Sequence, residues 1–552
     1  MSTQAHACKN CSHSFEITPD DFSFYEKLQV PPPTWCPECR LKRRFAHRNE
    51  RALYKRKCDL CGESIIAVFS PSKPYKVYCP KCWHSDKWDA LSYGREYDPS
   101  RLFFEQFREL QLAVPHLSLL QENAVNSPWI NYETDDKNCY LNFGGHLNED
   151  CAYNQYNLKT KDCLDNFWLM KSEYGYESIL CENSYRIMWS TFCYDCRDTY
   201  ASLDCRNCSN IIGCTGLRHK QYHIFNEPVS KEEYETFVKE NMSGSYEKHQ
   251  ALLHKAREFW KSRPQRATFI EKSVNCKGHL IFESKNCSEC LSVEKGEDSK
   301  YAVYVLESKD SQDITSIWKS ELCYDSIGAM STSSVLFTAG ALDSASRVQY
   351  SKLVFACQDC FGCINIKKKQ YCILNTQYSK SEYEKLRDRI IADMRERGEY
   401  GEFFSPSLSL FSYDETVAYE WFPMTKEEVV GSAFGGNWDD HESASYQFSD
   451  YQIPDRVHDV HDDILEKVLK CKISGKAYRI TPMELAFYRR FNIPIPLEAP
   501  FERHHRRLRF ITDHRTLRPR ECASCHAPIQ SVYSKEEFPI VYCEECYQKE
   551  VI

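Results

Sequence analysis

Cysteines in closely spaced pairs are the residues of this sequence with the clearest chemistry. A C-x-x-C turn directs two thiolates toward one point, and two such turns complete a tetrahedral four-thiolate zinc site. Because four thiolates leave no open coordination position, such a site is structural rather than catalytic. We therefore predict three structural zinc ions, at Cys8, Cys11, Cys36 and Cys39 (site 1), Cys58, Cys61, Cys79 and Cys82 (site 2), and Cys522, Cys525, Cys543 and Cys546 (site 3).

The two ends of the chain are copies of one double module. Sites 2 and 3 align cysteine for cysteine, and the two C-x-x-C pairs are separated by the same length of chain in both. Site 1 aligns in the same way with a segment that we call the reduced unit: Cys471, Ser474, Ala499 and Glu502. Three cysteines are lost there together, which indicates that their counterparts in site 1 belong to a single site. The alternative, in which Cys8 and Cys11 share a site with Cys58 and Cys61, is therefore less favoured. Cys471 is then expected to be a buried thiol.

The residues around site 1 resemble the zinc-ribbon, treble-clef family, whose pattern runs C-x-x-C, Phe, Phe-Tyr, Pro and then C-x-x-C-R. Phe15, Phe24-Tyr25 and the segment from Cys36 to Arg40 carry this resemblance. The overall layout also resembles uncharacterised zinc-ribbon proteins of small-genome bacteria and large DNA viruses. The resemblance implies small zinc-centred folds and no particular activity.

Charge is unevenly distributed along the chain. Residues 1–90 and 468–552 each hold 15 Lys and Arg against 10 Asp and Glu. Because the total charge is −8, the middle of the chain carries −18.

In a treble clef the second C-x-x-C opens a helix, and arginines three or four residues apart then share a face. Such a face suits nucleic-acid phosphates; a solvated face and pairing with the protein's own acidic middle are the alternatives. The expected phosphate-binding residues are Arg40, Lys42, Arg43, Arg44, Arg48, Arg51, Arg503, Arg506, Arg507 and Arg509.

Nine cysteines between residues 139 and 214 are all separated by multiples of three. Neither a helix nor an alternating strand has this period, whereas stacked β-solenoid coils with small inward side chains do. Coils built from four or from six of these three-residue steps both fit. A second copy follows, in which Cys193, Cys196 and Cys205 become Leu342, Ala345 and Val354. This replacement favours a buried packing role over the alternative of a metal site, because free cysteine behaves as a small apolar residue.

These patterns predict a mainly β chain with α-helices. Duplicated treble-clef or zinc-ribbon modules at both ends flank two parallel β-solenoid (β-helix-like) repeats with helical connectors. The expected domains are 1–92 (double zinc module), 93–138 (helical connector), 139–229 (first solenoid), 230–265 (helix and linker), 266–378 (second solenoid), 379–467 (helix and irregular connector) and 468–552 (C-terminal double module, its first unit metal-free).

The function is less clear from sequence than the architecture. No nucleotide-binding, hydrolase or metalloprotease motif is recognised, which favours a non-catalytic protein. The first hypothesis is a protein that binds nucleic acid, RNA rather than DNA and most simply structured RNA or a ribosomal surface, through basic zinc modules spaced by an acidic solenoid. The alternatives are an interaction scaffold or assembly component that binds an acidic protein surface or forms oligomers, and a β-helix transferase or carbohydrate-active enzyme. The absence of an apolar stretch of roughly 20 residues and the polar N-terminus predict a cytoplasmic protein without a membrane span.

Overall fold

A computed structural model describes residues 2–440 and 446–551. The chain forms two compact units, and each unit combines two separate segments. Unit 1 contains residues 1–120 and 269–440, and unit 2 contains 121–268 and 441–552. Each unit holds one terminal cysteine module and one array of parallel strands. The N-terminal module thus shares a unit with the second array, and the C-terminal module shares one with the first.

The N-terminal module of unit 1 consists of short strands and helices, and two of its helices begin directly after a cysteine. Cys36 and Cys79 occupy the N-cap positions of these two helices. A capping box formed by Thr18 and Asp21 starts the helix between the two halves of site 1. The elements are β1 (Gln4–Ala7), β2 (Ser14–Ile17), α1 (Pro19–Lys27), α2 (Pro37–Phe45), β3 (Tyr54–Lys57), β4 (Ser64–Ala67), β5 (Val77–Tyr78) and α3 (Pro80–Trp83).

The C-terminal module of unit 2 has the same order of elements. Thr481 and Glu484 form the capping box that Thr18 and Asp21 form in unit 1, and Ala499 takes the N-cap position of Cys36. The reduced unit therefore keeps its local fold without its cysteines. The elements are β33 (Leu469–Lys470), β34 (Ala477–Tyr478), α10 (Pro482–Phe491), α11 (Pro500–Asp513), β35 (Arg518–Glu521), β36 (Pro528–Ser531), β37 (Val541–Tyr542) and α12 (Glu544–Glu550).

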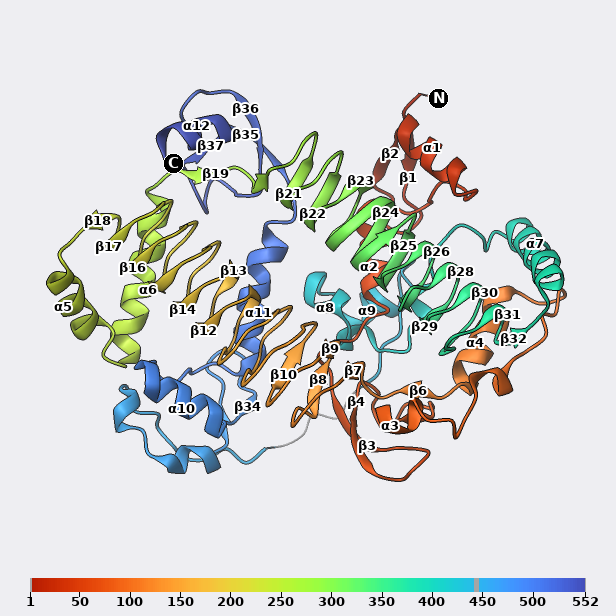
Figure 1. Ribbon diagram of the computed structural model, residues 1–552, viewed down its shortest axis with the longest axis horizontal. Helices are drawn as coiled ribbons and strands as arrows, with labels where there is room; N and C mark the ends of the chain where they lie inside the picture. Colours follow the sequence, from red (N-terminus) through yellow and green to blue (C-terminus); the bar gives the residue numbers. More distant parts are fainter. Residues whose placement is uncertain (1, 441–445, 552) are drawn as a thin grey trace. The chain divides into compact units, whose positions relative to one another are not determined.

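Array 1, in unit 2, stacks short parallel strands side by side (Figure 1), and the register between them advances in steps of twelve residues. Tyr185 pairs with Arg197, which pairs with Ser209, and an antiparallel strand, β18 (Glu227–Pro228), ends the series. We call each twelve-residue repeat a layer. The parallel strands are β7 (Gln121–Glu122), β8 (Trp129–Asn131), β9 (Glu133–Thr134), β10 (Tyr140–Phe143), β11 (Phe167–Met170), β12 (Glu173–Tyr176), β13 (Ile179–Glu182), β14 (Tyr185–Met188), β15 (Arg197–Tyr200), β16 (Ser209–Ile212) and β17 (Gln221–Ile224).

Array 2, in unit 1, has the same construction, except for an eleven-residue step at its start and one longer layer. Ser333 pairs with Ser346, a step of thirteen, whereas its counterpart Tyr185 pairs with Arg197. Beyond this layer the alignment of the two arrays moves by one position, so that Ser346 corresponds to Arg197. The strands are β20 (Ile270–Glu271), β21 (Lys277–Phe282), β22 (Ser288–Glu294), β23 (Glu297–Lys300), β24 (Val303–Glu321), β25 (Tyr324–Met330), β26 (Ser333–Leu336), β27 (Ala339–Leu342), β28 (Ser346–Gln349), β29 (Lys352–Phe355), β30 (Gln358–Phe361), β31 (Gln370–Ile373) and the antiparallel β32 (Thr376–Gln377).

The period of three arises from the backbone. Nearly every third residue of both arrays has a positive φ close to 50°, a conformation that costs an L-residue roughly 1–2 kcal/mol. The next residue points inward, and this is the phase of the nine cysteines. Inward side chains join successive layers: the Cys163 thiol donates to the Lys161 carbonyl (3.1 Å) and accepts from the Gly175 N–H (3.2 Å). Cysteine is thus both a small apolar group and a hydrogen-bonding group in these positions.

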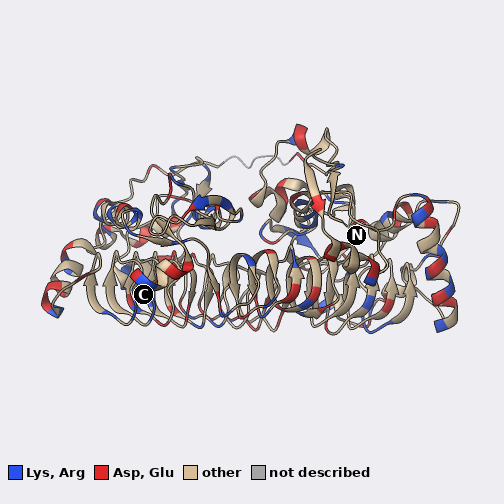
Figure 2. Ribbon diagram, turned by 90° about the horizontal axis from the view of Figure 1, so that it is seen from above, with Lys and Arg blue, Asp and Glu red and all other residues tan. Residues whose placement is uncertain are grey.

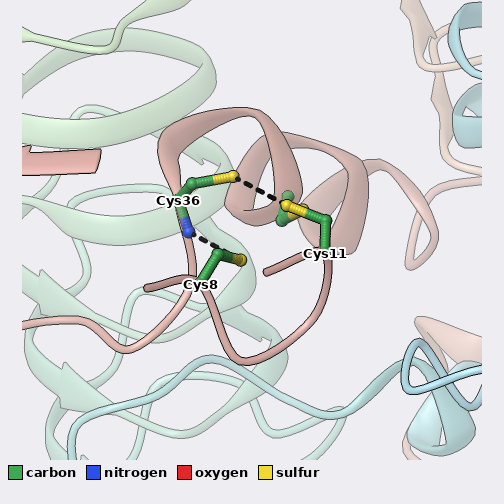
Figure 3. Close-up of side chains that lie close together, drawn as sticks. Cys8, Cys11 and Cys36 are labelled. Carbon is green, nitrogen blue, oxygen red and sulfur yellow. Dashed lines mark hydrogen bonds between the residues drawn. The ribbon is translucent and has the colours of Figure 1, made fainter. Parts of the chain in front are cut away.

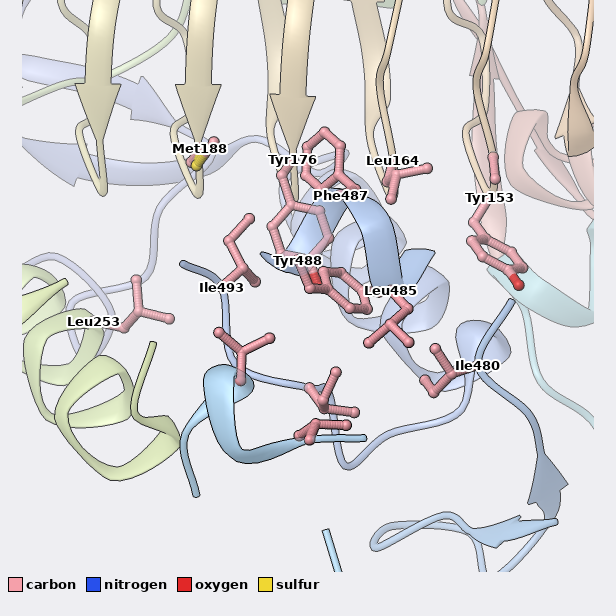
Figure 4. Packing of buried hydrophobic residues seen from close by; sticks show 14 of the residues in the cluster. Tyr153, Leu164, Tyr176, Met188, Leu253, Ile480, Leu485, Phe487, Tyr488 and Ile493 are labelled. Atoms are coloured by element: carbon pink, nitrogen blue, oxygen red, sulfur yellow. The ribbon is translucent and has the colours of Figure 1, made fainter. Parts of the chain in front are cut away.

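Helices cover parts of each unit. In unit 2, α10 packs side chains such as Phe487 and Tyr488 against Tyr176 of array 1, within a cluster that also includes Leu253 (Figure 4). No helix within residues 2–440 and 446–551 combines the length and apolar character of a membrane span. The remaining helices and short strands are α4 (Phe103–Ala113), β6 (His116–Leu117), α5 (Lys231–Asn241), α6 (Tyr246–Lys261), β19 (Gln265–Arg266), α7 (Lys380–Glu396), α8 (Val417–Trp421) and α9 (Lys426–Val430), with 3-10 turns at Ala90–Tyr93, Pro406–Leu408, Tyr413–Glu415, Val457–Asp459 and Asp462–Glu466.

Candidate metal centres

The three predicted four-cysteine sets each come together in space. Within sites 1, 2 and 3 the four Sγ atoms all lie within 4.8 Å of one another, so each set could hold a metal ion. Within the described part of the chain, these are the groups of three or more Cys, His, Asp or Glu with that geometry. The inward cysteines of the arrays, including the C-x-x-C pairs of array 1, are not among them.

Site 1 shows how the local fold prepares thiolates for a metal. The Cys36 N–H donates to Cys8 Sγ (3.2 Å), and Cys11 Sγ lies 3.7 Å from Cys36 Sγ (Figure 3). The Asn10 side-chain amide donates to Cys39 Sγ (3.1 Å). The hydrogen bond with the Cys39 thiol lowers the pKa of Cys36 to about 5, against the opposing effect of burial. Donors directed at sulfur stabilise the thiolate, which is the form that binds metals.

Sites 2 and 3 repeat the bond between the third and first cysteines of site 1. The Cys79 N–H donates to Cys58 Sγ (3.3 Å), and at site 3 the Cys543 N–H donates to Cys522 Sγ (3.2 Å). Burial raises the pKa of both acceptor thiols, but backbone N–H donors outweigh it and lower the pKa of Cys58 to about 7 and of Cys522 to about 6. The duplication in sequence is therefore also a duplication of the thiolate environment.

The reduced unit keeps one bond of this arrangement. The Ala499 N–H donates to Cys471 Sγ (3.3 Å), in the place of the bond between Cys36 and Cys8. Cys471 is buried, as expected. Ser474, Ala499 and Glu502 supply no further thiolate, so this unit does not form a four-cysteine site.

The arginines that follow site 1 do share a helix face, but the face is a packing face. Arg40, Arg43 and Arg44 lie on α2 with only 1%, 2% and 0% of their surface exposed. Each forms an ion pair with a buried carboxylate of array 2. The pairs are Arg40–Asp313 (2.8 Å), Arg44–Asp313 (3.2 Å), Arg44–Asp325 (2.8 Å) and Arg43–Asp325 (2.7 Å). These guanidinium groups do not face solvent, which corrects the expectation of a phosphate-binding surface here.

The same contacts occur in unit 2, between α11 and array 1. Asp165 and Glu177 are the counterparts of Asp313 and Asp325 in the alignment of the two arrays. Arg503 and Arg507 are buried, and only Arg506 keeps 42% of its side chain exposed. The pairs are Arg503–Asp165 (2.9 Å), Arg507–Asp165 (3.0 Å), Arg507–Glu177 (2.9 Å) and Arg506–Glu177 (2.8 Å). We call each set of three arginines and two carboxylates a latch.

Aromatic side chains complete each latch in the same way. The Arg40 guanidinium lies 5.2 Å from the centre of the Tyr301 ring, and the Arg503 guanidinium lies 5.3 Å from that of Tyr153, the counterpart of Tyr301. Burial raises the pKa of Glu177, but the charges of Arg506 and Arg507 outweigh this effect, so the pKa is lowered. The carboxylate is thus held in its charged form inside the unit.

The other residues expected to bind phosphate have varied surroundings. Arg48 is buried and pairs with Glu50 (2.5 Å), and Arg51 is partly buried with Glu420 3.9 Å away. Lys42 is partly exposed and lies 5.4 Å from the centre of the Phe422 ring. Of the ten residues, only Arg506 and Arg509 are exposed. Pairing with the protein's own acidic residues, the alternative raised from the charge distribution, describes most of this set.

One signal in the sequence points to the latch. The reduced unit lost three cysteines but kept Arg503, Arg506 and Arg507 in the positions of Arg40, Arg43 and Arg44. Because these arginines are retained where the metal ligands are lost, their role does not depend on the metal. Searches of protein-family models and of curated proteins find no match to this chain, so the zinc-ribbon resemblance is supported by the geometry of the cysteine sets alone.

Proposed function

We propose that this protein is a zinc-binding interaction scaffold in which terminal modules clamp two β-solenoids. Four thiolates arranged around one point favour zinc, and a closed four-cysteine set is a structural site. The twelve-residue parallel layers with inward small residues support the solenoid interpretation. Each solenoid is extended along its own axis, and it offers a long regular surface to a partner.

The latches carry this proposal. Basic residues that would otherwise bind phosphate are used inside each unit to attach a module to its array. Residues of both charge signs occur along the arrays (Figure 2), so the arrays do not present a surface of one sign. Both features fit a protein whose charges organise its own architecture.

Nucleic-acid binding, RNA first, remains the second candidate and would use other residues. Lys55, Lys57, Lys76 and Lys81 are all exposed on the module that holds site 2. Their counterparts at site 3 are Pro519, Glu521, Ile540 and Glu545. The basic character of the site 2 module is therefore specific to unit 1, and it provides a defined place to test.

The test compares what the purified protein carries before and after a high-salt wash. A scaffold should show a protein-like ratio of absorbance at 260 and 280 nm at both salts, and should recover a protein complex that resists nuclease. Salt-labile nucleic acid that is lost in the Lys55→Glu, Lys57→Glu double variant would instead establish the second candidate, because phosphate contacts weaken steeply with salt. The Arg509→Glu, Lys535→Glu double variant, at exposed positions outside the latch, is the matched control at the other end.

Metal analysis tests the zinc component separately. We expect about three zinc ions per chain from the three four-thiolate sets. A content of about five or six would contradict the assignment of the array cysteines to packing.

A further inference from the structure

A polar groove follows the outer edge of array 2, across five layers of unit 1. It has a volume of about 660 Å³ and is bordered by two columns of side chains that repeat from layer to layer. Register pairs such as Glu297 with Lys309 and Ser333 with Ser346 align the members of a column. The first column is Lys295, Glu307, Lys319, Ser331 and Ser344, and the second is Glu297, Lys309, Glu321, Ser333 and Ser346.

We propose that this groove binds a neutral, extended oligosaccharide. Three lysines and three glutamates balance one another in the lining, so the groove does not attract a polyanion or a polycation by net charge. It offers closely alternating donors and acceptors instead, and hydroxyls of serine can act as both. A chain of sugar hydroxyls, each of which donates and accepts, is the ligand class that matches this pattern.

The centre of the groove holds charged groups that are available to a ligand. At one end Lys309 pairs with Glu297 (3.2 Å) and Lys295 approaches Glu307 (3.9 Å). In the described part of the chain, by contrast, no ion pair involves Lys319 or Glu321, and both are exposed. An ammonium and a carboxylate in adjacent columns can each hydrogen-bond a sugar hydroxyl.

An exposed aromatic ring borders the same layer. Trp318 precedes Lys319 and is 37% exposed, which is unusual for so large an apolar side chain. Its register partner in the next layer is Met330, and the Lys319 ammonium lies 5.6 Å from the centre of its ring. Tryptophan combines an apolar face with a polar edge, and that face can stack on the C–H face of a sugar ring.

The repeat distance favours a glycan over a peptide. Neighbouring layers lie about 4.8 Å apart in the hydrogen-bonding direction, whereas an extended peptide advances only about 3.3 Å per residue. One sugar in an extended glycan advances by a distance close to one layer. Successive sugars can therefore meet equivalent positions in successive layers.

Array 1 shows what closes such a groove. The counterparts of Ser331, Ser333, Ser344 and Ser346 there are Asn183, Tyr185, Asp195 and Arg197. The Arg197 guanidinium lies 5.2 Å from the centre of the Tyr185 ring, and Asn183 donates a hydrogen bond to Asp195. Large paired side chains occupy the positions at which array 2 has only serines.

Titration calorimetry with cellohexaose, maltohexaose and chitohexaose on the full-length protein tests the proposal. We expect one of these probes to bind with a Kd below about 1 mM. Trp318→Ala should weaken that binding at least tenfold, and Ser333→Tyr with Ser346→Arg, which introduces the residues of array 1, should abolish it. Val274→Ala is the control, because Val274 is highly exposed on array 2 but, unlike Trp318, does not adjoin a residue of the groove lining.

Two results would overturn the proposal: no heat with any of the three probes, or binding that both groove variants leave unchanged. Unchanged thermal unfolding establishes that the variants are folded. This inference is independent of the scaffold proposal, since zinc content and any partner complex can be measured on the same variants and should not change.

Discussion

Site 1 and the reduced unit are two copies of one structure that differ in their metal chemistry. Site 1 has four thiolates, whereas the reduced unit has one, Cys471, yet both keep the hairpin, the capping box and a helix that carries three arginines onto an array. The latches are alike in partners and in distances. The comparison shows that metal binding and attachment to the array are separate properties, and that of the two only attachment is common to site 1 and the reduced unit.

Removal of a ligand from site 1 should have the largest effect. Cys36→Ser leaves three thiolates, and structural zinc supplies roughly 10–16 kcal/mol of apparent binding free energy to small folds of this kind. We expect the zinc content to fall by about one ion and the segment around site 1 to lose protection from hydrogen exchange. Cys471→Ser is the matched control and should cost only about 1 kcal/mol, because it weakens one hydrogen bond and removes no metal ligand. Comparable loss of protection in both variants would mean that the reduced unit has a ligand of its own.

Breaking the latch should affect both units equally. Arg44→Met in unit 1 and Arg507→Met in unit 2 each remove one of the two arginine partners from both buried carboxylates of the latch. Breaking a buried ion pair in this way costs about 3–5 kcal/mol. Hydrogen exchange within each unit measures the two effects in one protein. Arg509→Met, at an exposed position, should change stability by less than about 0.5 kcal/mol. A much smaller effect for Arg507→Met than for Arg44→Met would show that the latch depends on the metal after all.

Acid should weaken both units through buried histidines. Burial lowers the pKa of His116 in unit 1 to about 4 and of His249 in unit 2 to about 3, from 6.5. Between these values and pH 6.5 the unfolded chain binds more protons than the folded chain, so stability falls as the pH falls. At pH 5 each group should remove about 2 kcal/mol relative to pH 7.5. Denaturant unfolding at both pH values checks this, and His116→Gln should flatten the response of unit 1 only.

The smallest effect concerns the inward hydroxyls of the arrays. Ser178 accepts from the Ser190 N–H (3.4 Å), and its counterpart Ser326 accepts from the Thr338 N–H (3.2 Å). Ser178→Ala and Ser326→Ala should each cost about 1 kcal/mol, because a buried N–H loses its partner. Equal values measured by chemical denaturation would show that the layers are equivalent in the two arrays. A neutral substitution in one array would mean that its N–H finds another acceptor.

Sequence was most informative where the structure is local. The cysteine pairs of sites 1 to 3 could be recognised from spacing because a C-x-x-C turn brings two thiolates together within four residues, and the joint loss of three cysteines in the reduced unit showed which pairs share a site. The period of three in array 1 marked the inward phase correctly, but it left open whether a layer contains four or six of the three-residue steps. That choice depends on the register between strands, which the spacing of a single column of cysteines does not specify.

The latches could not be predicted from charge alone. Arg40 and Arg44 lie in a run of basic residues that is indistinguishable in composition from an exposed binding face. Their partner Asp313 lies 269 residues from Arg44, and no local pattern connects them. The pairing of each module with the more distant array is likewise a property of the tertiary structure, since the two arrays offer nearly the same carboxylates.

Each unit combines segments that are far apart in the sequence, and this has a consequence for protein synthesis. Asp165 is made 342 residues before Arg507, and Arg44 is made 269 residues before Asp313. At roughly 5–20 residues per second, a ribosome takes about 15–70 seconds to close these intervals. The arginines of α2 therefore leave the ribosome long before their carboxylates exist, and the carboxylates of array 1 long before their arginines. Neither unit can be completed during the first half of translation, so the nascent chain must keep the first half of each latch soluble until the second half has been made.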